Sequence, residues 1–316
     1  MIDLEAVVSL RAVATQGSVV AAATSLGFTP SAISQQVKRL ERDTGVALLA
    51  RAGRGVILTE AGRRLVTSSS PILADLERLH ADLHLAADPA GGHVTGEVRI
   101  AAFSTVVRGL LIPVLADLAE RHPDLRLPLR ESEPWETIAL VASGQRDLGV
   151  VHRWGGVALT MPDDLVTTPL FTDVADVVLP RTHPLAHRPH LTPTEMAELS
   201  WVATFEATIC RQWLRRLFDG VPNAPRVVHE SMEFPNHIEM VRAGLAVALI
   251  PRLGRAPLTP DVVAIPTWGP SSTRDVLVVH RRAQQDSPAL RAVIESLTLH
   301  SNHRATVGAS EGIQID

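Results

Sequence analysis

Hydrophobic and polar positions at the start of the chain follow the period of a helix. Residues 4–14 repeat apolar side chains at helical spacing, and the pattern ends at Gly17. A second, shorter run of helical character follows Ser18, a good N-cap residue, and stops at Gly27. Glycine favours the left-handed backbone that ends a helix. The pattern therefore predicts two short helices joined by a tight turn.

A third helix follows, and its start signals are clear. Thr29 suits the N-cap, and Pro30 suits the first helical position, where a missing N–H is harmless. The apolar positions predicted to face inward are Ala32, Ile33, Val37 and Leu40. The other positions of this helix carry polar side chains, of types that bind the base edges and phosphates of DNA. The arrangement is that of a helix-turn-helix with its third helix presented to the major groove, although this segment alone also fits an ordinary exposed helix face. The predicted DNA contacts here are Ser18, Thr29, Pro30, Ser31, Ser34, Gln35, Lys38 and Arg39.

Two short apolar pieces, residues 46–49 and 56–58, come next. Arg51, Arg54 and two glycines separate them, which predicts a β-hairpin wing with a basic tip. Arginines at such a tip reach the sugar-phosphate backbone or the minor groove, so both are predicted DNA contacts. Residues 1–59 are thus predicted to form an all-α winged helix-turn-helix domain.

The pattern then becomes that of one long helix, residues 60–88, beginning after Thr59 as its cap. Apolar positions recur every seven residues, and a second set is offset by four, which is typical of a helix that seeks a partner helix. We expect a linker and dimerisation helix in a homodimer or homotetramer. The alternative is a helix packed on its own domain, with a kink at Pro71. The positions in the two sets are Leu65, Ile72, Leu79 and Ala86, and Ser69, Leu76 and Leu83.

The order of these segments resembles the winged helix-turn-helix domain of LysR-type transcriptional regulators. The resemblance lies in GSVVAAATSLGFTPSAISQQVKRLE (residues 17–41), in the wing LLAR and GRGVILTEAG, and in the long helix. Leu10 and Val19 depart from it, because the family usually has aromatic residues there, and Pro30 stands where it often has glutamine. The resemblance implies a DNA-binding transcriptional regulator. Its second half would bind an effector and would be built like a periplasmic solute-binding protein.

The rest of the chain agrees with that implication. Residues 89–96 are rich in glycine and contain a proline, which predicts a hinge. Strands and helices then alternate, which predicts two Rossmann-like α/β subdomains within residues 97–300, with a ligand cleft between them. The segments DLGVVH, LPRTHPLA and VRAGLAVALIP also resemble the family. The expected subdomains are 97–163 with 268–300, and 164–267, followed by a disordered tail, 301–316.

Candidate effector contacts follow from strand ends and from the resemblance. Ser104 and Thr105 sit where a strand meets the start of a helix, whose free N–H groups favour an anion, so a carboxylate is the first expectation. The facing subdomain would contribute Thr204, Phe205 and Glu206, with His152 nearby. Glu206, if directed inward, would favour a zwitterion such as an amino acid. A solvated Glu206 is the alternative.

Charge and composition narrow the partners. Residues 1–66 carry eight Lys and Arg against five Asp and Glu, net +3, whereas the remainder carries 22 against 29, net −7. Only the N-terminal part therefore favours a polyanion such as double-stranded DNA. No signal peptide or membrane span is apparent, which indicates the cytoplasm. The single cysteine, Cys210, excludes an internal disulfide, and we expect neither a metal site nor a cofactor.

Three classes of function remain open at this point. The first is a sequence-specific DNA-binding regulator controlled by a small effector. The second is a solute-binding or transport component, which the N-terminal unit and the missing export signal disfavour. The third is an α/β enzyme, but the sequence shows neither a glycine-rich phosphate loop nor a convincing catalytic set, so catalytic residues are not predicted.

Overall fold

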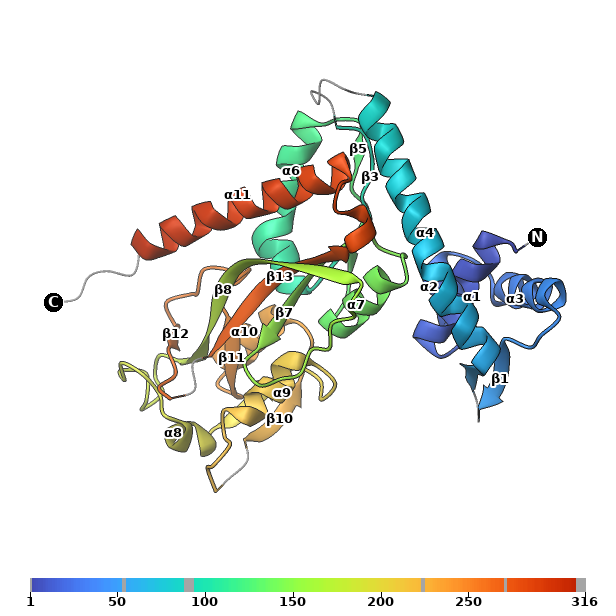
Figure 1. Cartoon of the computed structure of the whole chain (residues 1–316). Helices are drawn as coiled ribbons and strands as arrows, with labels where there is room; N and C mark the ends of the chain where they lie inside the picture. The colour runs from blue at the N-terminus through green and yellow to red at the C-terminus, as the bar shows by residue number, and fades with distance from the viewer. Residues whose placement is uncertain (1, 53–54, 88–93, 223–224, 270–271, 311–316) are drawn as a thin grey trace.

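The computed structural model describes residues 2–52, 55–87, 94–222, 225–269 and 272–310. Figure 1 shows a small helical domain at the N-terminal end, one long helix leading away from it, and a larger α/β region that holds the rest of the chain. Helix α1 and the C-terminal end of α11 lie on opposite sides of the molecule. The DNA-reading and effector-binding parts expected from the sequence are thus separate bodies.

The N-terminal domain contains three helices, α1 Leu4–Gln16, α2 Val19–Leu26 and α3 Pro30–Thr44. A side-chain oxygen accepts a backbone N–H in the first turn of each, which satisfies one of the donors that a helix start leaves open. Each helix ends at a glycine with φ between 67° and 73°, a conformation that costs other residues more. The predicted helix-turn-helix is confirmed. The N-caps are Asp3, Ser18 and Thr29, and the ending glycines are Gly17, Gly27 and Gly45.

The core of this domain explains two departures from the family pattern. Leu10 is fully buried beside Ile33 and Leu40, and Val19 packs against the same cluster. Aliphatic side chains therefore fill the space that aromatic rings would otherwise occupy. The close packing holds α3 against α1 and leaves its polar side to solvent.

The wing is an antiparallel hairpin of β1 Leu49–Ala52 and β2 Gly55–Leu58. The apolar piece predicted a first strand from Val46, but the strand begins three positions later, at Leu49. The reason is a side chain of α3, since the Glu41 carboxylate accepts the N–H groups of Leu48 at 2.8 Å and Leu49 at 3.2 Å. This carboxylate fixes the position of the wing relative to α3.

A single helix, α4 Glu60–Ala87, leads out of the domain and continues through Pro71. Its first part packs on the domain core through Leu65 and Leu73. Farther along, large apolar side chains are exposed in the single chain. Both interpretations of this helix, packing on its own domain and seeking a partner, therefore find support in different stretches of it. The exposed side chains are Ile72, Leu76, Leu79 and Leu83.

The larger region is built on a mixed sheet. Its strands are β4 Ile100–Ala102, β6 Leu129–Glu131, β7 Leu148–Trp154, β8 Leu165–Pro180, β9 Ser200–Ala203, β10 Arg226–Glu230, β11 Val247–Pro251, β12 Val262–Ile265 and β13 Thr273–Arg281. A small pair, β3 Gly96–Glu97 and β5 Leu125–Arg126, lies apart from it. The helices are α5 Ser104–Val106, the π-helical η1 Val107–Leu111, α6 Ile112–Arg121, α7 Pro134–Ala142, α8 Pro193–Ala197, α9 Ile209–Arg216, α10 Phe234–Arg242, the 3-10 helix η2 Arg282–Gln284 and α11 Pro288–Ser310.

Two long strands join the halves of this sheet, whose order in the described residues is β10-β9-β11-β8-β13-β7-β4-β6, with β12 beside β8. Strands pair in parallel within each half, as β4 does with β6 and β7, and β9 with β10 and β11. The long strands β8 and β13 instead run antiparallel to their neighbours. The parallel pairing expected from alternating strands and helices thus holds inside each half. The two strands that cross between the halves pair antiparallel instead.

Local details differ from the sequence prediction in the strands. The apolar and polar pattern of LRLPLRE is that of one strand, but the segment divides at Pro128 into β5 and β6. Proline has no N–H to donate to a ladder, although the carbonyl of Pro128 still accepts the N–H of Ile100 at 2.8 Å. Strand β12 was not predicted, because its four residues, VVAI, have no alternation to mark them.

The C-terminal helix corrects the expected tail. Disorder was predicted from residue 301, but α11 continues through Ser310. Its inner side is held by apolar packing, since Leu290, Val293 and Leu297 are buried in the first half of the α/β region. Ser301 is buried as well, and its hydroxyl donates to the carbonyl of Leu297 at 2.6 Å. Residues 311–316, and residues 88–93 in the predicted hinge, lie outside the described part of the chain.

The helical domain also contacts the α/β region directly. The guanidinium of Arg11, on α1, donates to the carbonyl of Ser143 just after α7. Gly144 lies so close that a Cβ there would meet Arg11 Nη2 at 2.6 Å. Figure 1 shows α7 between the sheet and the helical domain.

Candidate functional site

Polar side chains cover the outer side of α3. Thr29 caps the helix, because its Oγ1 accepts the N–H of Ala32 at 3.2 Å, and it lies 2.9 Å from the hydroxyl of Ser31. Pro30 follows at the first helical position and is exposed. The outer side thus offers hydroxyl, amide and cationic groups, as predicted for a recognition helix. Its other predicted DNA contacts are Ser34, which is half-buried, and Gln35, Lys38 and Arg39, which are exposed.

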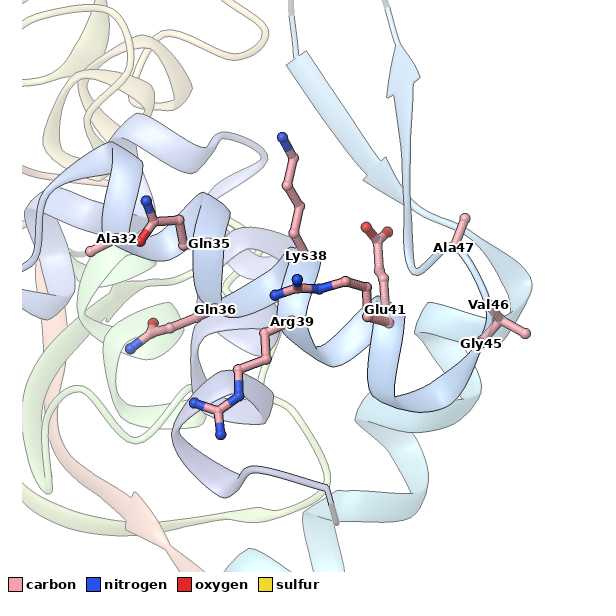
Figure 2. A pocket seen from close by; sticks show the side chains of 10 residues that line it. Ala32, Gln35, Gln36, Lys38, Arg39, Glu41, Gly45, Val46 and Ala47 are labelled. Atoms are coloured by element: carbon pink, nitrogen blue, oxygen red, sulfur yellow. The ribbon is translucent and has the colours of Figure 1, made fainter.

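The two adjacent cations of α3 have different surroundings. Figure 2 shows Lys38 and Arg39 extending to different sides of the helix. Arg39 Nη1 lies 3.7 Å from the Asp3 carboxylate, but 64% of its side chain is exposed, so this contact contributes little. Lys38 has no ion-pair partner among the described residues. Both groups are therefore available to phosphates.

A shallow hollow lies between α3 and the start of the wing (Figure 2). Gln35 and Lys38 line one part of it, and Val46 and Ala47 line another. Arg42 lines it too, although it was not among the predicted contacts. Arg42 comes four residues after Lys38 and so lies on the same face of a helix, and this spacing could have identified it as a DNA contact.

The other predicted DNA contacts have mixed outcomes. Ser18 caps α2 by accepting the N–H of Ala21 at 3.0 Å, which gives it a structural role beside α3. Arg51 lies on β1 with its side chain exposed. Arg54, predicted at the tip of the wing, lies outside the described residues.

A second candidate site is a cavity of about 40 Å³ between the halves of the α/β region. It brings together four residues predicted to contact an effector: Ser104, Thr105, His152 and Thr204. Ser104 and Thr105 follow β4, His152 lies in the last part of β7, and Thr204 follows β9. Convergence of strand ends from two halves is the usual geometry of a ligand cleft in such folds.

Arg274 organises the floor of this cavity. It is fully buried, and its guanidinium bonds to the Asp173 carboxylate at 2.9 and 3.0 Å. It also donates to Thr105 Oγ1 at 2.6 Å and lies 5.0 Å from the centroid of the Phe103 ring. A buried charge of this kind needs such partners. The Thr105 hydroxyl is consequently engaged by the protein itself.

His152 lies beside it, 2% exposed, with its ring edge-on to Phe103 at 4.5 Å. Burial, and secondarily the charge of Arg274, hold the pKa of His152 well below its usual value, so the imidazole is neutral. Its Nδ1 has no hydrogen-bond partner among the described residues. A buried polar atom without a partner in a cavity wall is the kind of group that a ligand satisfies.

Acidic side chains line the same cavity. Burial raises the pKa of Glu133, against the opposing charge of Arg274 and with the repulsion of Glu131. Burial also raises the pKa of Glu131, and the nearby Glu233 raises it further. These carboxylates therefore share one region of the wall, and none of the three was predicted. Glu131 ends β6 and Glu133 precedes α7, so the strand-end argument applied to Ser104 would have found them.

Two predicted effector contacts lie elsewhere. Phe205 is 49% exposed and does not line the cavity. Glu206 turns to the surface, where its carboxylate binds Arg211 at 3.0 Å and lies 3.8 Å from Arg215. The solvated alternative for Glu206 therefore describes this structure, because arginines on α9 hold the side chain.

The remaining lining is mostly occupied by internal contacts. The hydroxyls of Thr204 and Thr208 lie 2.7 Å apart and bond to each other. Cys210 lines the cavity too, and burial raises the pKa of its thiol to about 11.

Within the part of the chain that the structure describes, His, Cys, Asp and Glu side chains form no group of three suited to a metal ion. The described helices include none long and apolar enough to cross a membrane.

Comparison with known proteins places this arrangement in context. The family model for the bacterial regulatory helix-turn-helix protein, lysR family, matches residues 4–63, and that for the LysR substrate binding domain matches residues 91–301. The probable HTH-type transcriptional regulator LrrA of Synechococcus elongatus is 28% identical over 256 residues, which cover 81% of this chain and 83% of that protein.

Solved structures show the same fold. A full-length variant of OxyR from Pseudomonas aeruginosa superimposes with a TM-score of 0.62 at 20% identity, covering 96% of this chain and 95% of that one. Full-length CbnR in complex with its target DNA superimposes with a TM-score of 0.52 at 20% identity, covering 95% and 99%. Because the two matched family models account for both the helical domain and the α/β region, the chain belongs to the LysR family of transcriptional regulators, with a DNA-binding helix-turn-helix domain and a ligand-binding domain.

Proposed function

We propose that α3 enters the major groove of DNA and that the wing contacts the adjacent backbone. The observation that carries this proposal is the exposed polar face of α3, on which Lys38 has no protein partner among the described residues and Arg39 has only a weak one. Ser31, Ser34 and Gln35 would contact base edges, while Lys38 and Arg39 would contact phosphates. The exposed Arg51, and Arg54 by its position in the sequence, would extend the backbone contacts.

The cavity between the two halves would hold the effector. Ser104, Thr105, His152 and Thr204 lie in its wall, so a ligand there contacts both halves at once and favours one relative arrangement of them. We place the protein in the cytoplasm, because a bacterial regulator of transcription acts where the DNA is. The apolar stripe on α4 supports a homodimer or homotetramer, in which two recognition helices meet two half-sites.

A solute-binding or transport role is the less favoured second function. The ligand domain alone fits it, but the helix-turn-helix domain would then have no use. The relative LrrA quoted above is named a probable transcriptional regulator as well, which supports regulation rather than catalysis.

Binding to a site selected from random-sequence DNA tests the proposal. We expect the Lys38→Ala, Arg39→Ala double variant to bind more weakly and to reduce the slope of log affinity against log salt by about 2, since each lost phosphate contact removes roughly 0.9. The matched control replaces Arg215 and Arg216, an exposed adjacent pair on α9. A folded double variant with the affinity and salt slope of the wild type would exclude α3 as the DNA-binding element.

A further inference from the structure

The charges around the effector cavity are predominantly negative. Glu131, Glu133 and Glu233 contribute carboxylates to its wall, and Arg274 is the one guanidinium among the lining residues described. Arg108 lies 3.8 Å from Glu233 and offsets part of that charge. Glu131 and Glu233 are exposed, whereas Glu133 is half-buried, so the charge of Glu133 acts more strongly on a ligand than it would on an open surface.

The one cation in the wall is already engaged. Arg274 directs Nε and Nη2 to the carboxylate of Asp173 and Nη2 also to Thr105 Oγ1. These contacts neutralise its charge inside the fold, and rearranging them would leave the 5%-exposed Asp173 side chain unpaired. An anionic ligand would therefore meet several carboxylates, while the charge of Arg274 is already balanced by Asp173.

His152 supplies a second, independent indication of a ligand. Its side chain is almost fully buried, it lines the cavity, and its Nδ1 lacks a hydrogen-bond partner among the described residues. A neutral imidazole has one nitrogen with a free lone pair, which accepts a hydrogen bond. The wall thus presents an imidazole acceptor in addition to its carboxylates.

We infer that the effector carries a primary ammonium group, which binds in this cavity between Glu133, Glu131 and the imidazole of His152. An ammonium has three N–H donors and no acceptor, so it matches such a wall, and its bonds to carboxylates are charge-assisted. A cavity of about 40 Å³ holds only a few water-sized groups, so this end of the ligand is small and the remainder must extend out of the cavity. This inference rests on the proposed effector role of the cavity.

The inference also changes the expected ligand chemistry. A plain carboxylate was the first expectation from the helix start at Ser104, but the glutamates now oppose it. An amino acid remains compatible, because its ammonium would face the glutamates and its carboxylate could accept from Ser104.

Calorimetric titration with matched probes tests the inference. We would compare methylamine, propylamine and putrescine with formate, butyrate and succinate, at pH 7.5, on the full-length protein. Amines are expected to bind, and the Glu133→Gln variant is expected to weaken the tightest amine about tenfold to a hundredfold, since it removes a charge-assisted hydrogen bond. The control Glu120→Gln changes an exposed glutamate on α6 that does not line the cavity, and it should bind amines as the wild type does.

The pH dependence of amine affinity is a second test, and it needs no variant. Because burial raises the pKa of Glu133, protonation at falling pH removes its negative charge while the amine stays charged. Amine affinity should then decrease as the pH is lowered from 7.5 to 5, whereas the affinity of an anion would increase. If Glu133→Gln does not fold, Glu131→Gln takes its place.

Two outcomes would overturn the inference: amine binding that is unchanged in the folded Glu133→Gln variant, or binding of carboxylates with no binding of amines. DNA titration with the tightest probe separates this result from the proposed function. A carboxylate that alters DNA affinity would sink the ammonium inference and leave the effector role standing. An amine that binds through Glu133 without altering DNA affinity would support the ligand chemistry and argue against the effector role.

Discussion

Asp147 shows how individual residues keep a buried charge in this fold. Its carboxylate accepts hydrogen bonds from Arg99 Nε and Nη2, each at 2.8 Å, and from Gln284 at 3.2 Å, and Arg281 lies 3.3 Å away. Burial raises its pKa, but the hydrogen bonds and charge of Arg99 outweigh burial and lower the pKa from 3.8 to about 2. The carboxylate therefore favours the folded state when it is ionised.

Replacing Asp147 by Asn should lower the free energy of unfolding at pH 7 by about 2 kcal/mol, because a pKa shift of one unit corresponds to about 1.4 kcal/mol. The folded pKa lies below the unfolded one, so this stabilisation is complete above about pH 4 and is lost as the pH falls towards 2. Urea denaturation at pH 7 and pH 3 measures both effects, with the exposed Asp163→Asn as control. A difference between variant and wild type that does not shrink at pH 3 would contradict this account.

The thiol of Cys210 should react slowly in the folded protein. Since burial raises the pKa of its thiol to about 11, the thiol stays protonated near neutral pH and is a poor nucleophile. We expect a disulfide reagent to label the native protein far more slowly than the unfolded chain at pH 8. Equal rates in the two states, measured by release of the coloured thiol product, would show that the side chain is accessible.

Helix α4 exposes leucines that could contact a second chain. Leu76 and Leu83 are 43% and 62% exposed, so glutamate at both positions should leave the fold of one chain intact. If the stripe is the contact between chains, the Leu76→Glu, Leu83→Glu variant should sediment as a monomer and bind a dyad-symmetric site at least a hundredfold more weakly, roughly the loss of one half-site.

The matched control introduces the same charges elsewhere on α4, at the exposed positions Thr67 and Ser68. It should keep the oligomeric state of the wild type. A Leu76→Glu, Leu83→Glu variant that still sediments with the wild type would assign the contact between chains to another surface.

At the scale of the whole molecule, the contact of Arg11 with Ser143 joins the DNA-reading domain to the first half of the ligand domain. The carbonyl it binds lies at the C-terminal end of α7, where Arg281 occupies the carbonyl of Val141 in the same way. Cations favour such helix ends. The contact therefore joins α1 to the ligand domain at a point separate from the long helix.

Removing that contact should free the two domains from one another without unfolding either. We expect Arg11→Ala to increase the radius of gyration in small-angle X-ray scattering, while circular dichroism stays unchanged. Arg63→Ala, which breaks an exposed pair with Glu60 inside α4, is the control. An unchanged scattering profile for Arg11→Ala would mean that the rest of the interface holds the domains together.

Local signals in the sequence determined the elements near the N-terminus. Ser18, Thr29 and the glycines after each helix act within a few residues of where they stand, so capping chemistry predicted the three helices. The resemblance to LysR-type regulators then favoured a helix-turn-helix over an ordinary exposed helix face. Strand ends, together with the resemblance to the family, predicted Ser104, Thr105 and His152. The charge difference between the first 66 residues and the remainder likewise needed no structure.

Tertiary structure decided what depends on partners distant in the chain. Arg274 meets Thr105 across 169 positions, and Leu49 begins a strand only where Glu41 holds it. Glu206 faces α9 rather than the cavity because arginines there bind it, and the glutamates of the cavity wall gather from two halves that only the crossover strands bring together. Periodicity and capping report the immediate neighbours of a residue, whereas the charge balance of a cleft is set by side chains that meet only after the chain has folded.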